Sequence, residues 1–208
     1  MSNVLADTSE TLRKLLEDEF AADVGLGGVA TFFAGANTEV SIATPEEMTT
    51  GNKQGLSVWL YRVVRDETRL NDPPTIRPAA AGGVEMVPPP LPLRLHYLVT
   101  PLADQAPDTE QKILGRVLRT FHTRPLLSGT ALQGDLIGTG TEIAVRLESL
   151  TLDEMSRVWE ALEGSYQLSV SYEVTLALIA SNTVPLRPSI VESVRRDSAL
   201  ILAAETVA

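Results

Sequence analysis

The chain has 208 residues, of which 44% are hydrophobic and 5% are aromatic, enough for one domain with a sizeable aliphatic core. It contains no cysteine, which excludes disulfides and thiolate metal sites. A formal net charge of −10 argues against a nucleic-acid-binding protein that works by neutralising phosphates, so we expect no nucleic-acid partner.

The first residues, MSNVLADTSETLRKLL, lack the basic and then apolar order of a secretory signal. The sequence also lacks an apolar run of about 18 residues, the length that a membrane-spanning helix requires. These two features predict a soluble cytoplasmic protein that does not insert into a membrane.

The N-terminal part of the chain predicts one helix and one β-hairpin. Residues 4–20 carry a helical apolar stripe, and Asp7 with Glu10 three positions later fits a capping box. Residues 29–34 (VATFFA) and 38–43 (TEVSIA) are rich in β-forming residues, and the Gly-Ala-Asn between them suits a turn. The two segments are therefore expected to pair with each other.

The next part of the chain predicts two strands separated by a loop. Residues 56–64 (LSVWLYRVV) are apolar on both faces, which is typical of a central strand. Residues 71–92 contain seven prolines and a Gly-Gly pair, which argue against a central strand or a regular helix and predict a long exposed loop. Residues 91–102 alternate in hydrophobicity and predict the second strand.

Two further helices and one strand follow. One helix is expected to begin at Asp108 as N-cap, with Gln111 in the capping-box position, and its apolar face carries Ile113, Leu114, Val117, Leu118 and Phe121. Residues 143–150 predict a strand. Residues 152–162 predict a helix that is capped by Thr151 and Glu154.

A long C-terminal strand is predicted by residues 165–180, SYQLSVSYEVTLALIA, in which apolar and polar side chains alternate. Such a strand would extend about 50 Å at roughly 3.3 Å per residue. It either exceeds its own sheet, so that its free backbone groups pair with another chain, or bends at a bulge within one sheet. The last twenty residues are compatible with a helix that begins near Ser189 or with a strand over SALILAA.

The usual chemical signatures of enzymes are weak in this sequence. His96 and His122 lack metal-ligand spacing, and the glycine-rich stretches 25–28 and 138–140 precede strands, which is typical of turns and not of phosphate loops. We therefore expect no catalytic, cofactor-binding or metal-binding residues. A hydrolase that uses the carboxylate pair Glu46 and Glu47 remains a third reading.

Four segments, taken together and in order, resemble one protein family. They are LSVWLYRVVRDETRLND (56–72), PPLPLRLHYLVTPLA (89–103), EQKILGRVLRTFHTRPLL (110–127) and WEALEGSYQLSVSYEV (159–174). The family is the cap, or tail-terminator, protein of contractile injection systems, which are phage-tail-like particles of bacteria. The match lies in its N-terminal cap domain.

The resemblance implies an α/β (α+β) fold in which helices flank a mixed β-sheet, similar to phage tail terminators, with the long C-terminal strand added. Residues 1–184 would form the cap domain and residues 185–208 a C-terminal extension. The implied protein is not an enzyme: it forms a homo-oligomeric ring, expected to be six-fold, that contacts sheath and inner-tube proteins and stops their elongation. The particle is then kept in the cell or released. The alternative function is an adaptor that links such a particle to cargo or to a membrane partner.

The candidate interface follows from the long strand, the proline-rich loop and basic residues that meet acidic neighbours. The loop has a second interpretation as a disordered surface. The interface candidates are Tyr166, Leu168, Ser169, Ser171, Glu173, Pro73, Pro74, Pro88, Pro89, Arg195 and Arg196. Six copies would carry a charge of about −60, so ring association should depend on salt unless basic residues offset the repulsion. The residues considered for this are Arg13, Lys14, Arg116, Arg119, Arg195 and Arg196.

Overall fold

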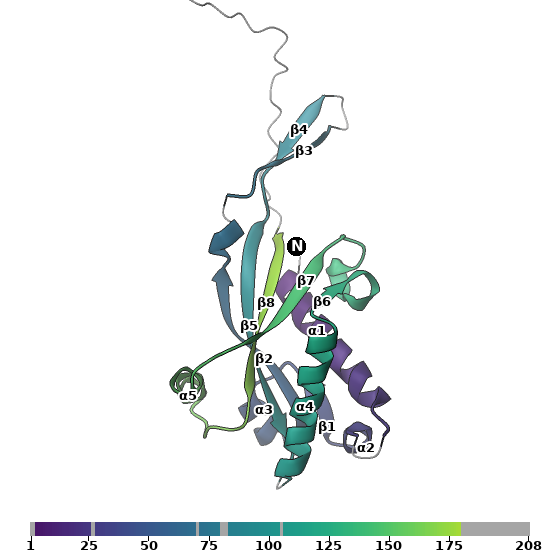
Figure 1. Ribbon diagram of the computed structural model, residues 1–208, viewed down its shortest axis with the longest axis vertical. Coiled ribbons are helices and arrows are strands. Elements are labelled where there is room, and N and C mark those ends of the chain that lie inside the picture. The colour runs from purple at the N-terminus through teal and green to yellow at the C-terminus, as the bar shows by residue number, and fades with distance from the viewer. Residues whose placement is uncertain (1–2, 26–27, 70, 80–82, 105, 180–208) are drawn as a thin grey trace, which may run out of the picture. The chain divides into compact units, whose positions relative to one another are not determined.

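The chain folds into two compact units, of which the first comprises Met1–Asp72 and Pro90–Ser181 and the second contains Pro73–Pro89 (Figure 1). The computed structural model describes residues 3–25, 28–69, 71–79, 83–104 and 106–179. The expectation for the last twenty residues therefore lies outside the described residues.

The first unit is built on a six-stranded mixed sheet. The strand order is β1 (Thr38–Ser41), β2 (Gln54–Arg65), β5 (Leu91–Leu102), β8 (Val170–Ile179), β7 (Glu142–Glu148) and β6 (Leu126–Ser128). Only β1 and β2 are parallel among these described neighbours. The predicted mixed sheet with flanking helices is confirmed. The 56–64 strand forms as part of β2, but β1 pairs only with residues 54–57 of β2, so most of this strand has a described neighbour on one side only, and the prediction of a central strand is wrong for that part.

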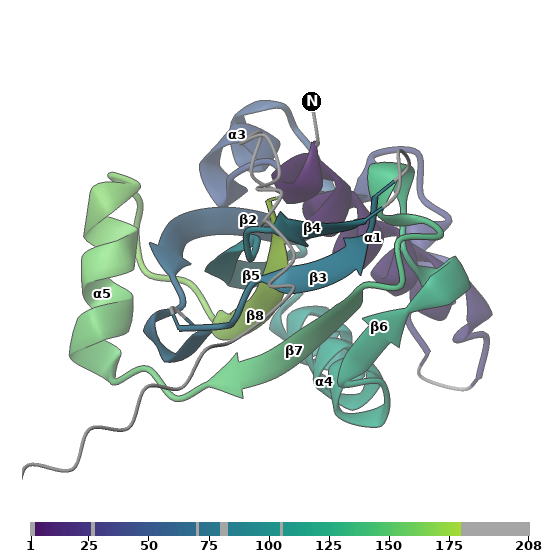
Figure 2. The same cartoon turned by 90° about the horizontal axis from the view of Figure 1, so that it is seen from above.

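Helices cover both faces of this sheet (Figure 2). The long helices α1 (Val4–Ala22) and α4 (Pro107–Thr123) pack on one face, and α5 (Leu152–Ala161) packs on the other. Shorter helical elements occupy the connections: α2 (Ala30–Phe33), α3 (Pro45–Thr50), and the 3₁₀ turns Glu67–Arg69, Gly129–Ala131 and Gly134–Leu136.

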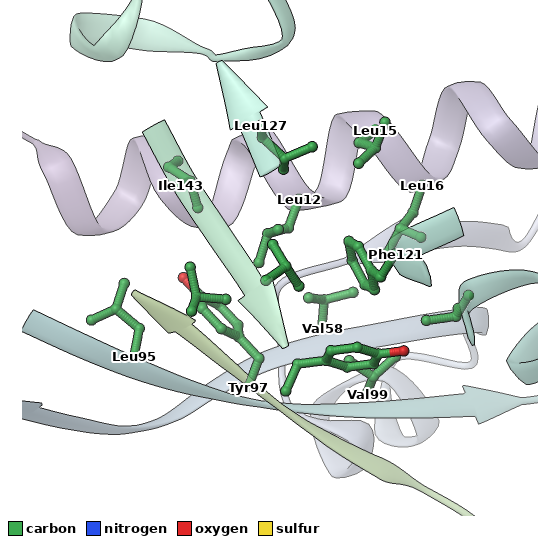
Figure 3. Packing of buried hydrophobic residues seen from close by; sticks show 14 of the residues in the cluster. Leu12, Leu15, Leu16, Val58, Leu95, Tyr97, Val99, Phe121, Leu127 and Ile143 are labelled. Carbon is green, nitrogen blue, oxygen red and sulfur yellow. The ribbon is translucent and has the colours of Figure 1, made fainter. Parts of the chain in front are cut away.

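The main core lies between the sheet and the α1/α4 layer (Figure 3). Along β5 the side chains of Leu95, Tyr97 and Val99 enter this core, whereas Leu98 points to the opposite face and packs beneath α5. The Tyr97 hydroxyl forms a 2.9 Å hydrogen bond with Ser9 of α1, and burial raises the pKa of Tyr97 to about 12. The alternating pattern in the sequence therefore directs successive side chains of β5 to the two opposite helix layers.

The predicted hairpin over residues 29–43 is wrong. Residues 30–33 form α2, where Phe33 stacks on Phe20 of α1 with 4.5 Å between ring centroids. The second segment does form a strand, β1, but it pairs in parallel with β2 after the chain has passed through α3. Packing against α1 outweighs the local β propensity of VATFFA, which is a property of half-buried surfaces more than of the backbone.

Two of the predicted helix caps are also wrong, and one is confirmed. Helix α1 begins at Val4, and Asp7 instead accepts a 3.0 Å hydrogen bond from the backbone N–H of Asp135. Helix α4 begins at Pro107, which places Asp108 in its first turn. The capping box at Thr151 is present, with Glu154 accepting from the Thr151 backbone N–H at 2.8 Å. Helix α1 thus begins three residues before Asp7 and α4 one residue before Asp108, whereas the cap at Thr151 follows the local sequence.

The second unit corrects the predicted loop over residues 71–92. It forms an antiparallel hairpin of β3 (Thr75–Pro78) and β4 (Val84–Val87), in which Thr75 lies opposite Val87 and Pro78 opposite Val84. The prolines remain compatible with this structure because they flank the strands or end one of them, where no ladder hydrogen bond is required.

Strand β8 is shorter than predicted and begins at Val170, five residues after Ser165. Two contacts hold the preceding segment against α5: the Trp159 indole donates to Ser169 Oγ at 3.1 Å, and the rings of Trp159 and Tyr166 lie 6.3 Å apart. Over its described length β8 pairs with β5, and Ser171–Thr175 also pairs with β7. The described part of β8 is therefore an interior strand that does not extend beyond its sheet.

Candidate functional site

The predicted interface residues around the start of β8 separate into exposed and buried groups. Tyr166 and Leu168 keep 50% and 42% of their surface exposed, although both are large and apolar. Ser169 and Ser171 keep only 7% and 1%. Tyr166 and Leu168 are therefore open to another molecule, whereas the two serines contribute to the packing of this chain.

Ser171 belongs to a polar cluster that lies between four strands. Its hydroxyl donates to Glu148 Oε2 of β7 at 2.7 Å, and the same oxygen lies 3.1 Å from Nδ1 of His96 on β5. The Tyr61 hydroxyl of β2 lies 3.0 Å from Ser171 Oγ and also donates to Glu148 Oε2 at 3.4 Å. The cluster thus ties β2, β5, β8 and β7 together.

The same cluster tunes the acidity of Glu148. Burial of this carboxylate acts to raise its pKa, but hydrogen bonds from Ser171 and His96 outweigh burial and hold the pKa of Glu148 below its ordinary value. The order of contacts differs from that of a nucleophilic triad, in which the histidine lies between the serine and the acid. Here the acid lies between the serine and the histidine, so the base does not touch the hydroxyl. The arrangement is that of a structural hydrogen-bond network.

Glu173, another predicted interface residue, is engaged within the chain. Its carboxylate lies 3.4 Å from Nη1 of Arg94 on the neighbouring strand β5, and Nε of the same guanidinium lies 3.6 Å from Asp66. The hydroxyl of Thr68 donates to Asp66 and holds the pKa of this carboxyl below its usual range. Glu173 therefore already forms an ion pair with Arg94 of the same chain at the sheet surface.

The four predicted prolines lie at the base of the β3–β4 hairpin. Pro73 and Pro74 precede β3 and are exposed, whereas Pro88 and Pro89 follow β4 and are half-buried. The hairpin itself presents apolar side chains to solvent, with Ile76 65% exposed and Val84 42% exposed. The unit therefore offers an apolar ribbon with two outer backbone edges.

Three of the six basic residues considered for intersubunit contacts are already paired inside the chain. Arg13 pairs with Glu10 and Glu17, Lys14 pairs with Asp18 at 2.9 Å, and Arg116 pairs with Glu19 at 3.0 Å and with Asp23 at 3.3 Å. Arg195 and Arg196 lie outside the described residues. Among the basic residues considered from the sequence, Arg119 is therefore the one that lies in the described part of the chain and forms no salt bridge with a described residue.

An apolar groove between α4 and β7 was missed by the sequence reasoning. It has a volume of about 810 Å³. Its floor is formed by Leu118, Phe121, Val145, Leu147 and Tyr172, and its rim carries Arg119, His122 and Arg146. Leu147 is 55% exposed, although it lies on the same face of β7 as the buried Ile143 and Val145. The signal in the sequence was weak because the two walls come from segments that lie more than twenty residues apart.

The described residues contain neither a cluster of metal-ligand side chains nor a helix long and apolar enough to cross a membrane.

Comparison with known proteins places these surfaces in context. Residues 7–193 match the model of the Pvc16 N-terminal domain. A sheath/tube terminator of the PVC extracellular contractile injection system, solved in the extended state, shares 16% identity and a TM-score of 0.54 over 92% of this chain and 64% of its own. The tube-terminating cap of the anti-feeding prophage shares 17% identity and a TM-score of 0.57, over 89% of this chain and 59% of its own.

The solved structures show the fold, and this chain spans less than two thirds of the length of either one. Comparison with curated proteins gave no match. The family model, by contrast, covers all three layers of the first unit and the hairpin, from α1 to beyond β8. The resemblance read from the sequence is thus confirmed, and the chain belongs to the Pvc16 N-terminal domain family.

Proposed function

We propose that this protein is the terminator of a contractile injection system, a ring that closes the inner tube and the sheath at one end and stops their elongation. The observation that carries this proposal is the family match over residues 7–193, together with a fold shared with two terminators. The protein acts as a structural component and not as an enzyme.

The distribution of exposed apolar residues supports a ring subunit. Among them are Tyr166 and Leu168 just before β8, Ile76 on the hairpin, and Leu147 in the floor of the α4–β7 groove. A subunit in a closed ring touches its two neighbours through two different surfaces, because the contact is heterologous. A terminator also needs a surface for the last layer of the polymer. Several separate apolar patches meet these needs better than one large patch.

The ring is expected to be six-fold and to bind sheath and tube proteins of the same particle. Its subunits assemble in the cytoplasm, and the finished particle either stays in the cell or leaves it. Both solved relatives are terminators, so they give the adaptor alternative no support.

Deletion of the gene, followed by electron microscopy of purified particles, tests the proposal. Without a terminator, sheath and tube lengths should become irregular or assembly should fail, and expression of the intact protein should restore a narrow length distribution. Particles of normal length that lack only cargo or attachment would refute the terminator function and would favour an adaptor.

A further inference from the structure

The outer edge of β7 is only partly paired. Strand β6 covers residues 142–144 of β7, and the last contact on that side is a 2.8 Å hydrogen bond from Val145 N–H to Pro125 O. Successive residues of a strand direct their backbone groups to opposite sides. Leu147 therefore directs its N–H and C=O the same way as Val145, beyond the end of β6, where no described strand pairs with it. Figure 2 shows β7 continuing past β6.

This open edge forms one wall of the α4–β7 groove. The groove floor is apolar, and the exposed side chains of Arg119 and His122 lie on its α4 side. Arg146 of β7 also lines the groove at this edge, but it alternates with Val145 and Leu147, so its exposed side chain starts from the opposite face of the strand. Neither arginine forms a salt bridge with a described residue, in a chain whose net charge is −10. The groove thus combines free backbone hydrogen-bonding groups, apolar surface and unpaired positive charge at one place.

These three properties define the occupant. It must be an extended segment, since it has to satisfy the N–H and C=O of Leu147. It must carry apolar side chains for the groove floor and negative charge for the rim. It must also lack proline, which cannot donate to a ladder.

Residues 197–208, DSALILAAETVA, have this chemistry. The segment contains Leu200, Ile201, Leu202 and Val207, two acidic residues, no basic residue and no proline. By contrast, the β3–β4 hairpin balances Arg77 against Glu85 and is neutral over its strands.

We propose that residues 197–208 of a second copy of this chain add as a strand to the open edge of β7 and place apolar side chains in the α4–β7 groove. The proposal rests on the ring function above and deepens it. The 17 residues from 180 to 196 can span up to roughly 56 Å when extended, enough to reach an adjacent subunit. Groove and tail are different surfaces, so the contact is heterologous and propagates around a ring.

Cysteine cross-linking of the full-length chain tests this contact, because the protein has no cysteine of its own. Leu147→Cys is combined, one at a time, with cysteine at positions 199, 200, 201, 202 and 203. Val24→Cys, at an 82% exposed site outside the groove, is the matched control with the same tail substitutions. Mild oxidation is followed by non-reducing gel electrophoresis.

We expect disulfide-linked oligomers with Leu147→Cys and few with Val24→Cys. Because side chains of an added strand alternate between faces, cross-linking should alternate in efficiency along positions 199–203. Three outcomes would each overturn the proposal. They are disulfides that form only within one chain, cross-linking that is equally efficient with Val24→Cys, and cross-linking that does not depend on the position of the tail cysteine. Rings that still form in microscopy while cross-linking fails would reject the tail contact and leave the terminator function intact.

Charge reversal at the rim gives an independent readout. Arg119→Glu combined with Arg146→Glu should slow cross-linking about fivefold at low salt, since two exposed attractions become repulsions. Two reversals in one variant change the net charge by four, so the control combines Arg157→Glu with Lys112→Glu, both exposed and outside the groove. Equal slowing in both variants would assign the effect to net charge and would overturn the groove contact.

Discussion

His96 Nδ1 lies 3.1 Å from Glu148 Oε2, although β5 and β7, which carry these residues, are separated by β8. The contact is possible because Glu148 lies opposite Ser171 on β8, which in turn lies opposite Leu98, two residues from His96. Three strands are therefore joined by one carboxylate. Because of this geometry, protonation of the Glu148 carboxylate changes the stability of the fold.

Glu148 should make the stability of the protein sensitive to acid. Its folded-state pKa lies below the ordinary value of 4.5, so the ionised carboxylate stabilises the fold above about pH 4.5. This contribution is lost as pH falls through the lower, folded-state pKa. We expect Glu148→Gln to be less stable at pH 7 and to lose less stability than the wild type between pH 5 and about pH 3. Urea unfolding at several pH values measures the difference.

Glu46→Gln is the control for this experiment, because Glu46 is an exposed glutamate on α3. It should follow the wild-type pH dependence. Parallel curves for the wild type and Glu148→Gln would contradict the role given to Glu148.

Gly55 should be irreplaceable in β2. Its φ of +123° is rarely adopted by other residues, and an added Cβ would lie 2.0 Å from the carbonyl oxygen of Glu39 on β1. We expect Gly55→Ala to reduce the free energy of unfolding by about 3 kcal/mol or more, from strain and from the displaced β1. Chemical denaturation measures this loss.

Gly115 provides the matched control in helix α4. An added Cβ there meets no atom within 4 Å. Gly115→Ala should therefore stabilise the protein by about 0.5–1 kcal/mol, because alanine loses less backbone entropy in a helix. If both substitutions changed the free energy of unfolding equally, the close approach of β1 to β2 would not be the cause of the loss in Gly55→Ala.

The exposed side chain of Leu168 should matter for assembly more than for folding. We expect Leu168→Asp to reduce ring formation at least tenfold at a given protein concentration, because it places a charge in an apolar contact, while the melting temperature changes little. Size-exclusion chromatography with light scattering reports the assembly state. Ser171→Asp should behave differently and unfold the chain, since this serine is 1% exposed. Normal rings from Leu168→Asp would remove this residue from the interface.

Ring association should strengthen with salt. Six copies together carry about −60, and three of the basic residues considered for offsetting this repulsion are paired internally. Raising ionic strength from about 20 mM to 300 mM shortens the range of repulsion from roughly 20 Å to 6 Å. Analytical ultracentrifugation should then show a larger ring fraction. Equal ring populations at low and high salt would contradict this prediction.

Local sequence was sufficient wherever one residue pattern has one structural solution. The alternation of β5, the helical stripes of α1 and α4, and the Thr151–Glu154 capping box were all predictable. The 29–34 segment was not, because its phenylalanines suit a strand and become helical only through contact with Phe20. The hairpin between Pro73 and Pro89 was missed for the opposite reason: prolines that exclude a central strand are compatible with a two-stranded ribbon.

The sequence by itself determined the family and the mixed α+β architecture, because these depend on side-chain patterns along single segments. Only the tertiary structure decided that Ser169 and Ser171 are buried, that three of the six candidate cations have internal partners, and that α4 and β7 form a groove. The physical reason is that burial, ion pairing and cavities are properties of side chains brought together from distant positions. A strand read alone shows which side chains share a face, but the neighbouring elements decide whether water or protein covers that face.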